Sequence, residues 1–288
     1  MVVPVKTINL NDRSRPSWAN ANESRPMRTT IWEPTGEGTC GVILLSHGTG
    51  GAAEDLGWLA EPLNQAGFLV AAVDHHGNSY VDEYLVEGFA FPWERPRDLS
   101  LLLDHLEAAY DVDQFRIGAA GFSLGGYTVA ALLGAMIEPR AATAVFSGIV
   151  PAPEVPEFPD LVATLRAAYS DAELETIITA AATTHADSRI RAGFLMAPAI
   201  GQLLDPTSLA TISAPLEVRW GDADDIAPPE VNAALYVSGI PAASGMSLGQ
   251  DVGHYVFLGD RPDPSHARNR TAADAVSFFR STLPSVTR

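Results

Sequence analysis

From Cys40 onward, apolar runs of strand length alternate with segments whose apolar residues recur at helical spacing. The runs Cys40 to Ser46 and Phe68 to Val73 are each followed by a helical pattern, the second of them near 97–110, and Arg116 to Ala120 forms the next apolar run. Continuous apolar strands separated by helices are typical of a mostly parallel sheet that is covered on both faces. The pattern therefore predicts an α/β fold.

The second half of the chain continues this alternation. Leu216 to Trp220 predicts a short strand, a helix is expected from about Pro229, and a weaker strand falls around Met246 to Leu248 before a closing helix. Ahead of the first apolar run, segments near 6–11 and 27–32 have the composition of strands. We expect these two to be antiparallel strands at one edge of the sheet.

Residues 138–190 interrupt the pattern. Two segments compete for the strand before Leu216: 141–150, which is strand-like in composition, and 191–197, which lies at a normal connection length from Leu216. We choose 191–197, so that 138–190 becomes a helical insertion. Because it leaves the sheet at the carboxyl end of a strand, where ligands of open α/β sheets bind, we expect it to form a cap. With 47% hydrophobic residues, the chain predicts one domain over 1–288.

The short motif with the clearest chemical meaning is Gly121-Phe122-Ser123-Leu124-Gly125. It stands between the predicted strand Arg116 to Ala120 and an Ala- and Leu-rich helical pattern. A serine hydroxyl is a poor nucleophile unless a histidine can accept its proton, and many hydrolases hold it on a sharp strand-to-helix turn flanked by small residues. Ser123 is therefore a candidate nucleophile. The alternative is a glycine-rich turn with a structural role only.

A base and an orienting acid for Ser123 are expected later in the chain, in the order serine, aspartate, histidine. His254 follows Gly253 in the loop that precedes the closing helix, a place suited to presenting an imidazole. Asp224 lies just beyond the strand Leu216 to Trp220 and is our first choice for the acid. Three other aspartates remain as alternatives: Asp205, Asp222 and Asp225.

Two backbone N–H groups are expected to stabilise a negatively charged oxygen next to Ser123. They belong to Leu124 and to Thr49, the latter in the loop His47-Gly48-Thr49-Gly50-Gly51. This loop lacks the spacing of a phosphate-binding loop, so it does not indicate a nucleotide site. Aromatic residues near the expected site suggest an apolar pocket. The side chains that we expect to contact substrate are His76, Trp93 and Tyr127.

Composition narrows the classes of partner. The chain has 18 Lys and Arg against 35 Asp and Glu, a net charge of −17, which argues against nucleic acid or an anionic membrane as partner. Cys40 is the only cysteine, so the chain has no intrachain disulfide and no multi-cysteine metal site. Neither a signal peptide nor an apolar window of 18 residues is seen, which predicts a cytoplasmic protein. We expect no metal and no cofactor.

An ordered set of motifs carries a family resemblance. The motifs are Leu45-Ser46-His47-Gly48-Thr49-Gly50-Gly51, Ala72-Val73-Asp74-His75-His76-Gly77-Asn78, Trp93-Glu94-Arg95-Pro96-Arg97-Asp98, Gly121-Phe122-Ser123-Leu124-Gly125-Gly126, Gly221-Asp222-Ala223-Asp224 with Pro228, and Gly253-His254. Together they resemble the α/β-hydrolase superfamily, most closely the bacterial branch described as dienelactone-hydrolase-like and akin to platelet-activating-factor acetylhydrolases. The resemblance spans about residues 40–260.

This resemblance implies an α/β-hydrolase fold and a cofactor-free carboxylic ester hydrolase acting on small or medium apolar esters, as a monomer or homodimer. Ser123 would be the nucleophile, His254 the base and Asp224 the acid, and the N–H groups of Thr49 and Leu124 would form the oxyanion hole. Two other functions are kept open. One is a perhydrolase or haloperoxidase that uses the same residues with peroxide, and the other is a non-catalytic binding protein.

The sequence also departs from each of the similar groups. Dienelactone hydrolases use a cysteine nucleophile, whereas the cysteine here is Cys40, far from the motif. The acetylhydrolases place the acid after the preceding strand, where this chain offers Asp205. Polyester-degrading cutinase-like enzymes flank the serine with His and Met, where this chain has Phe122 and Leu124. Substrate names are therefore not carried over.

Overall fold

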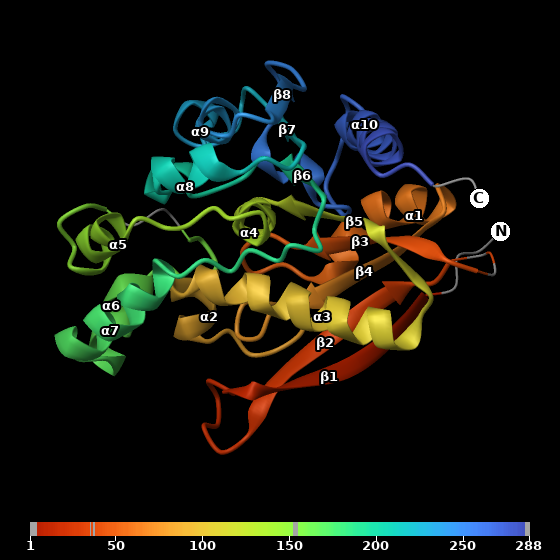
Figure 1. The fold of residues 1–288 in the computed structure, drawn as a ribbon. Coiled ribbons are helices and arrows are strands. Elements are labelled where there is room, and N and C mark those ends of the chain that lie inside the picture. Colours follow the sequence, from red (N-terminus) through yellow and green to blue (C-terminus); the bar gives the residue numbers. More distant parts are fainter. Residues whose placement is uncertain (1–4, 35, 37, 152–154, 286–288) are drawn as a thin grey trace.

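The structure is a computed structural model that describes residues 5–34, 36, 38–151 and 155–285. Residues 1–4 and 286–288 of the predicted domain lie outside the described residues, as do 152–154 of the insertion. The described residues form an eight-stranded sheet in the order β1-β2-β4-β3-β5-β6-β7-β8 (Figure 1). The strands are β1 (Val5–Pro16), β2 (Ser24–Trp32), β3 (Cys40–Ser46), β4 (Phe68–Asp74), β5 (Val112–Phe122), β6 (Ala192–Met196), β7 (Leu216–Trp220) and β8 (Ala243–Ser247).

Strand direction confirms the predicted α/β class. β1 pairs antiparallel with β2, β2 pairs antiparallel with β4, and every pair from β4 to β8 is parallel. The helices between the strands are α1 (Gly57–Gln65), α2 (Val86–Ala90), α3 (Arg95–Ala109), α4 (Leu124–Leu132), α5 (Pro139–Phe146), α6 (Leu161–Ala168), α7 (Asp171–Ala181), α8 (Pro206–Thr211) and α9 (Ala233–Gly239), and α10 (Ala267–Thr282) follows the last strand.

The central strand β3 shows how the sheet builds two cores. Its side chains alternate between faces: Val42 and Leu44 belong to the cluster formed with α3, α4 and α9, while Ile43 and Leu45 belong to the cluster formed with α1 and α10. Figure 1 shows α1 and α10 together on one face and α3 and α4 on the other. Fully burying each such side chain contributes about 1.5–3 kcal/mol. A strand buried on both faces must be apolar throughout, which is why these runs were recognisable.

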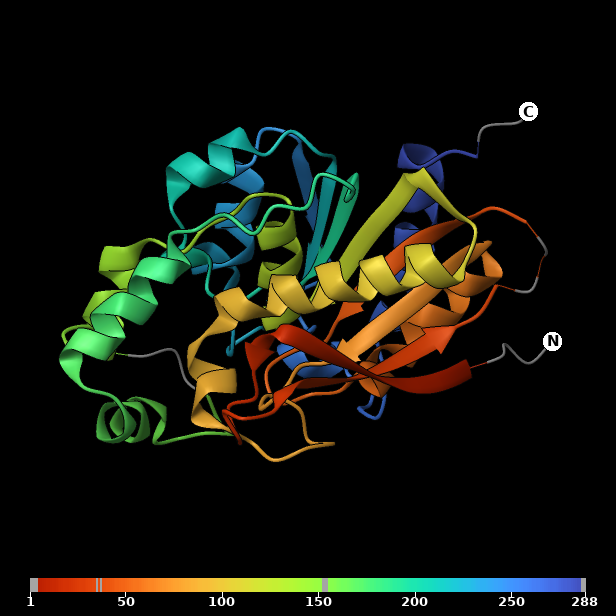
Figure 2. The same ribbon diagram turned by 60° about the horizontal axis from the view of Figure 1, so that its bottom comes forward.

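The segment 138–190 holds α5, α6 and α7. The strand expected at 191–197 is β6, whereas the competing segment 141–150 lies largely in α5. This helix begins where the Glu138 side chain accepts a hydrogen bond from the N–H of Ala141 and Pro139 occupies the first turn. Figures 1 and 2 both place α5, α6 and α7 on the side of the molecule opposite the start of β1 and the end of α10.

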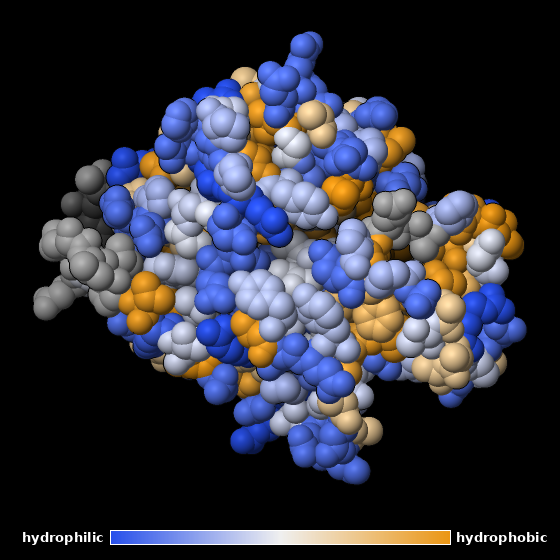
Figure 3. Space-filling model, turned by 180° about the vertical axis from the view of Figure 1, so that it is seen from behind, coloured by the Kyte–Doolittle hydropathy of each residue, from blue (hydrophilic) through white to orange (hydrophobic). Residues whose placement is uncertain are grey.

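One face of the molecule shows how hydrophilic and hydrophobic side chains are distributed on the surface. In the view of Figure 3, blue hydrophilic side chains predominate and orange hydrophobic ones form separate small patches. Among the described residues, no helix is both long enough and apolar enough to cross a lipid bilayer.

The turn between β5 and α4 is held in an unusual backbone conformation. Ser123 has φ 54° and ψ −118°, a region that non-glycine residues rarely adopt. Its N–H donates to the carbonyl of Met196 (2.9 Å) and its carbonyl accepts from the N–H of Ala199 (3.1 Å). Glycine at 125 is required by close approach, because a Cβ there would lie 2.0 Å from the carbonyl oxygen of Ser46. Tertiary contacts therefore impose this turn on the chain.

A Gly125→Ala substitution tests this close approach. The added methyl group collides with backbone at the end of β3, so we expect the free energy of unfolding to fall by about 1–3 kcal/mol. Gly57→Ala is the matched control, since nothing lies within 4 Å of the added Cβ and its helical φ of −54° suits alanine. Urea unfolding of the two variants measures the difference. Equal stability of both variants would contradict the tight contact.

Candidate active site

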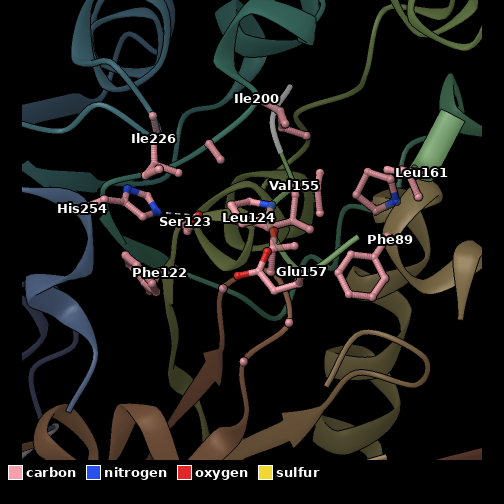
Figure 4. Close-up of a pocket in the computed structure, with 18 of the residues that line it drawn as sticks. Phe89, Phe122, Ser123, Leu124, Val155, Glu157, Leu161, Ile200, Ile226 and His254 are labelled. Atoms are coloured by element: carbon pink, nitrogen blue, oxygen red, sulfur yellow. Dashed lines mark hydrogen bonds between the residues drawn. The ribbon is translucent and has the colours of Figure 1, made fainter. Parts of the chain in front are cut away.

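Ser123, His254 and Asp224 form a continuous chain of hydrogen bonds. His254 Nε2 lies 3.0 Å from Ser123 Oγ, and His254 Nδ1 lies 2.7 Å from Asp224 Oδ2. The three residues are only 6%, 4% and 4% exposed. A carboxylate only accepts hydrogen bonds, so Nδ1 carries the proton and Nε2 is free to accept the proton of the serine hydroxyl. Figure 4 shows the His254 ring directed at Ser123, with this hydrogen bond dashed.

Asp224 is itself fixed by the backbone that follows it. Its Oδ1 accepts hydrogen bonds from the N–H groups of Ile226 (3.1 Å) and Ala227 (2.7 Å), which leaves Oδ2 for the histidine. The loops that carry the acid and the base also touch each other. The N–H of Ala223 donates to the carbonyl of Val252 (3.0 Å). These contacts set the distance between Asp224 and His254.

The other three candidate aspartates have different surroundings. Asp222 and Asp225 are exposed. Asp205 caps the N-terminus of α8, where its carboxylate accepts from the N–H groups of Thr207 (3.0 Å) and Ser208 (3.1 Å). Asp224 is therefore the aspartate that the structure brings to His254.

The two predicted oxyanion donors lie beside Ser123. Thr49 and Leu124 both line the cavity that contains the Ser123 hydroxyl, and neither N–H donates a hydrogen bond to any other described residue. Leu124 is the first residue of α4, so its N–H lies at the helix N-terminus, where the helix dipole favours negative charge. Gly48 packs directly on the serine: a Cβ on it would lie 3.3 Å from Ser123 Cβ. Both N–H groups are thus free to bind an oxygen of a bound molecule.

The cavity over Ser123 has a volume of about 420 Å³. Figure 4 shows it extending from Ser123, on the side away from His254, toward Phe89 and Leu161. Glu157 also lines it and lies against Gly50, since its Cγ is 2.6 Å from where a Cβ on Gly50 would stand. Most of the remaining wall is apolar and comes from the α2 region, α5, α6 and the loop after β6. These residues include Ala90, Trp93, Ile137, Ala142, Val145, Phe146, Val155 and Ile200.

The three side chains expected to contact substrate are divided by the structure. Trp93 lines the cavity, but His76 and Tyr127 are not among the described residues that do. His76 instead stacks on Trp18, with ring centroids 5.6 Å apart, and its Nε2 lies 3.1 Å from the Ser17 hydroxyl. Tyr127 is fully buried in the core beneath α4. The structure therefore corrects this expectation for His76 and Tyr127, because each is occupied by the protein's own packing.

A set of buried charges next to the site was not anticipated. It comprises three arginines and three carboxylates, called here the buried ionic cluster: Arg15, Arg25, Arg95, Asp12, Asp98 and the half-buried Glu94. Arg15 and Arg25 form its ion pairs, whereas Arg95 lies near enough to Asp98 for their charges to interact. The sequence held a signal, since Trp93-Glu94-Arg95-Pro96-Arg97-Asp98 places several charges where the neighbouring pattern is apolar. The partners on β1 could not be identified, because Arg15 and Asp98 are 83 positions apart.

Two histidines adjoin this cluster and are held neutral. Burial, reinforced by the charge of Arg95, lowers the pKa of His75 to about 4 and that of His47 well below its usual value. Burial opposes ionisation of Asp98, yet the charge of Arg15 and the hydrogen bond from His75 bring its pKa below the usual range. His75 Nδ1 therefore donates to an ionised Asp98 over 2.7 Å.

A known protein family and solved structures resemble this chain. Residues 37–244 match the model of the family described as Serine aminopeptidase, S33. The chain belongs to this family of hydrolases. The fold is that of the α/β hydrolases, as two solved structures also show. One is the esterase domain of a Rhodothermus marinus protein, with a TM-score of 0.57 and 14% identity over 97% of this chain and 99% of that one. The other is a cold-adapted esterase from an Arctic intertidal metagenomic library, with a TM-score of 0.57 and 12% identity over 98% of this chain and 95% of that one.

Two curated relatives of this hydrolase match over a shorter stretch. The uncharacterized protein YcjY of Escherichia coli (strain K12) is 37% identical over 96 residues, 32% of this chain and 30% of that protein. Cutinase est1 of Thermobifida alba is 32% identical over 103 residues, 34% of this chain and 31% of that protein. The match thus spans less than a third of either relative.

The neutral histidines predict an acid-dependent loss of stability. The unfolded chain takes up a proton on His75 near pH 6.5, whereas the folded chain does so only near pH 4. The stability that neutral His75 gives to the folded chain is therefore complete above about pH 6.5. It is lost as the pH falls to about 4, and the free energy of unfolding drops by up to about 1.4 kcal/mol per pH unit. Urea unfolding between pH 7 and 4.5 measures this slope. His75→Gln should make the slope shallower, and an unchanged slope would refute the assignment.

Proposed function

We propose that this hydrolase is a serine esterase that acts on small or medium apolar carboxylic esters through an acyl-enzyme. The observation that carries the proposal is the hydrogen-bonded chain from Ser123 through His254 to Asp224 at the wall of an apolar cavity. The printed names of the two structural neighbours, both esterases, and of the related cutinase favour ester substrates. The narrower resemblance to dienelactone-hydrolase-like enzymes stays a prediction.

In the proposed mechanism, Ser123 Oγ attacks the ester carbonyl carbon while its proton passes to His254 Nε2. The carbonyl oxygen becomes an anion that the N–H groups of Thr49 and Leu124 stabilise. When the intermediate collapses, the bond to the alcohol oxygen breaks and His254 returns the proton to it. Water then attacks the acyl-enzyme with His254 as base, which releases the acid. Asp224 holds the imidazole in the required tautomer and stabilises it when protonated.

Substrate selection is assigned to the insertion 138–190 together with α2. The acyl group would extend from Ser123 into the apolar part of the cavity, toward Phe89 and Leu161. α5 and α6 contribute much of that wall, which supports the interpretation of the insertion as a cap. Of the apolar insertion residues, Leu161 lines the cavity, whereas Leu165 is fully buried in the hydrophobic core.

Two substitutions test the proposed triad. Ser123→Ala should abolish hydrolysis of p-nitrophenyl esters and labelling by a fluorophosphonate probe, because no other hydroxyl is paired with His254 among the described residues. Asp224→Asn should lower kcat by a factor on the order of 10³ or more, because the histidine then loses its tautomer and its counter-charge.

Asp205→Asn and Asp222→Asn are the matched controls for the acid. Asparagine caps a helix about as well as aspartate, and Asp222 is exposed, so both variants should stay within about tenfold of the parent kcat. A folded Ser123→Ala protein that keeps more than a few per cent of the activity would refute the proposed nucleophile. A larger loss in Asp205→Asn than in Asp224→Asn would move the acid to the earlier loop.

Enlarging Leu161 tests the acyl pocket. Leu161→Trp should lower kcat/KM for hexanoyl and longer esters by about tenfold or more, since each excluded methylene is worth about 1–3 kcal/mol, while an acetyl ester is unaffected. Ile177→Trp is the control: it adds the same bulk to the half-buried face of α7, away from the cavity. A p-nitrophenyl ester chain-length series measures both. Equal losses on acetyl and longer esters would show that Leu161 has a structural role only.

A further inference from the structure

We propose that the buried ionic cluster positions the oxyanion loop, defined as residues 47–51, and that Arg95 is the residue through which it acts. This inference rests on the proposed function, because it assigns the Thr49 N–H to an oxyanion. Arg95 would be a positioning residue, since it is not among the described residues that line the cavity and would act through the backbone of the loop.

Three polar backbone groups on either side of Thr49 have fixed partners outside the loop. Arg95 donates from Nη2 to the carbonyl oxygen of His47. The N–H of Gly50 donates to Asn78 Oδ1 (2.8 Å), and the Gly50 carbonyl accepts from the Tyr84 hydroxyl (2.7 Å). Thr49, between these fixed peptides, has an N–H that donates to no described residue. The contacts around it therefore set its direction.

His47 and His75 add a second restraint on the loop. His47 Nδ1 donates to the Gly48 carbonyl (2.6 Å), and its Nε2 accepts from the N–H of His75 (3.0 Å). These roles require a neutral imidazole with the proton on Nδ1. Protonation of His47 would set two donors against each other at the His75 N–H. Burial of His47 near Arg95 prevents this, in agreement with the lowered pKa of its ring.

Behind the loop lies a second hydrogen-bonded serine, histidine and aspartate set. His75 Nδ1 donates to Asp98 (2.7 Å), and its Nε2 accepts from the hydroxyl of Ser46 (2.9 Å), the last residue of β3. Ser46 is fully buried, so no substrate reaches this hydroxyl. The arrangement repeats the hydrogen bonds of the candidate active site, but its effect is to fix the strand end from which the oxyanion loop departs.

The cluster connects these restraints to the N-terminal strand. Arg15 on β1 donates to Asp98 Oδ1 (2.5 Å) and to the backbone carbonyl of Glu94 (3.0 Å), and it also pairs with Asp12 (2.5 Å). Arg15 and Arg25 form ion pairs with the three carboxylates, and Glu94 also pairs with the more exposed Arg97. Arg95 forms no ion pair with them and interacts with Asp98 through charge alone. A buried ion pair is weak evidence for stability, because desolvation offsets most of its attraction. The cluster is therefore better understood through the geometry that it imposes than through the stability that it adds.

The surroundings of the Arg95 guanidinium give the strongest evidence that this residue positions the oxyanion loop. Its guanidinium is buried, and its Nε and Nη1 have no hydrogen-bond partner among the described residues. Burial lowers the pKa of this group to about 9, with partial compensation from the charge of Asp98. A side chain chosen for stability alone would not leave two buried donors unpaired. Its Nη2 donates to the His47 carbonyl of the oxyanion loop and lies 3.5 Å from the Ser46 hydroxyl, which stands just before that loop.

The test compares Arg95→Met and Arg95→Lys with the parent and with Arg219→Met. Arg219 is a matched control because it is also a buried arginine, paired with Glu217 (2.5 Å) and Asp274 (2.8 Å) at the other side of the sheet. Two readouts are used at a temperature where circular dichroism shows each variant folded. One is amide hydrogen exchange of peptides covering 47–51, and the other is kcat and KM for a matched oxygen ester and thionoester.

We expect Arg95→Met to speed exchange in the loop by about tenfold or more, because the opening equilibrium of the segment shifts. Its kcat on the oxygen ester should fall by a factor on the order of 10², with KM within about threefold, since the displaced Thr49 N–H would contact the substrate oxygen mainly in the transition state. The thionoester should lose much less, because thiocarbonyl sulfur is a poor hydrogen-bond acceptor and gains little from the oxyanion hole. Arg95→Lys should be intermediate, and Arg219→Met should change neither readout.

The outcomes separate this inference from the proposed function. Unchanged exchange in the loop, or equal losses on the two esters, would overturn the positioning role. If Ser123→Ala kept the parent activity, the proposed esterase mechanism would fail instead. The exchange measurement would then still decide whether Arg95 holds the loop, because it does not depend on turnover. If Arg95→Met fails to fold, Arg95→Lys carries the same comparison.

Discussion

The approach of Gly125 to the carbonyl of Ser46 is the contact on which the site depends. A Cβ at position 125 would lie 2.0 Å from that oxygen, so the first turn of α4 can pack against the end of β3 only when the residue is glycine. Ser123 stands just before this turn, and the oxyanion loop begins just after Ser46. One backbone contact thus brings together the nucleophile and both N–H groups that would bind its oxyanion. The positive φ of Ser123 is the local cost of this arrangement.

The buried polar groups of the site lie at one end of the sheet. The candidate triad and the buried ionic cluster both lie at the carboxyl ends of parallel strands, where ligands of open α/β sheets are bound. Each carboxylate there has a fixed donor: His254 and two N–H groups for Asp224, and His75 and Arg15 for Asp98. Because buried polar groups are costly when unpaired, such sets hold a single geometry. That rigidity suits groups that must be aligned before a reaction begins.

The sequence was sufficient wherever the determining contacts are local or strongly apolar. The strands β3 and β4 were recognisable because burial on both faces demands a continuous apolar run, and the turn at Ser123 because its glycines are close together in the chain. The aspartate partner of His254 was less certain, since Asp222, Asp224 and Asp225 have the same chemistry. What distinguishes Asp224 is a contact between its loop and Val252 that no local pattern encodes.

Two kinds of feature could not be predicted. Tyr127 was expected in the pocket because an aromatic residue beside the nucleophile suits both a pocket and a core, and only the packing of α4 decides between them. The buried ionic cluster depends on Arg15 of the first strand meeting Asp98 of α3, which requires the order of strands in the sheet. Long-range pairing of charges has no periodicity in sequence, so it becomes visible only when the topology is known.

The groups proposed to react and the side chains proposed to select the substrate come from different parts of the chain. The groups proposed to react come from turns at the ends of β3, β5, β7 and β8, whose positions are fixed by the hydrogen bonds of the sheet. Much of the apolar part of the cavity wall comes from α2 and the insertion, which are joined to the sheet by loops and add no strand to it. A substitution in the walls can therefore change the shape of the cavity without moving Ser123 or His254. The same sheet can serve different esters through changes at the cavity-lining side chains of α2, α5 and α6, because these helices carry none of the groups proposed to react.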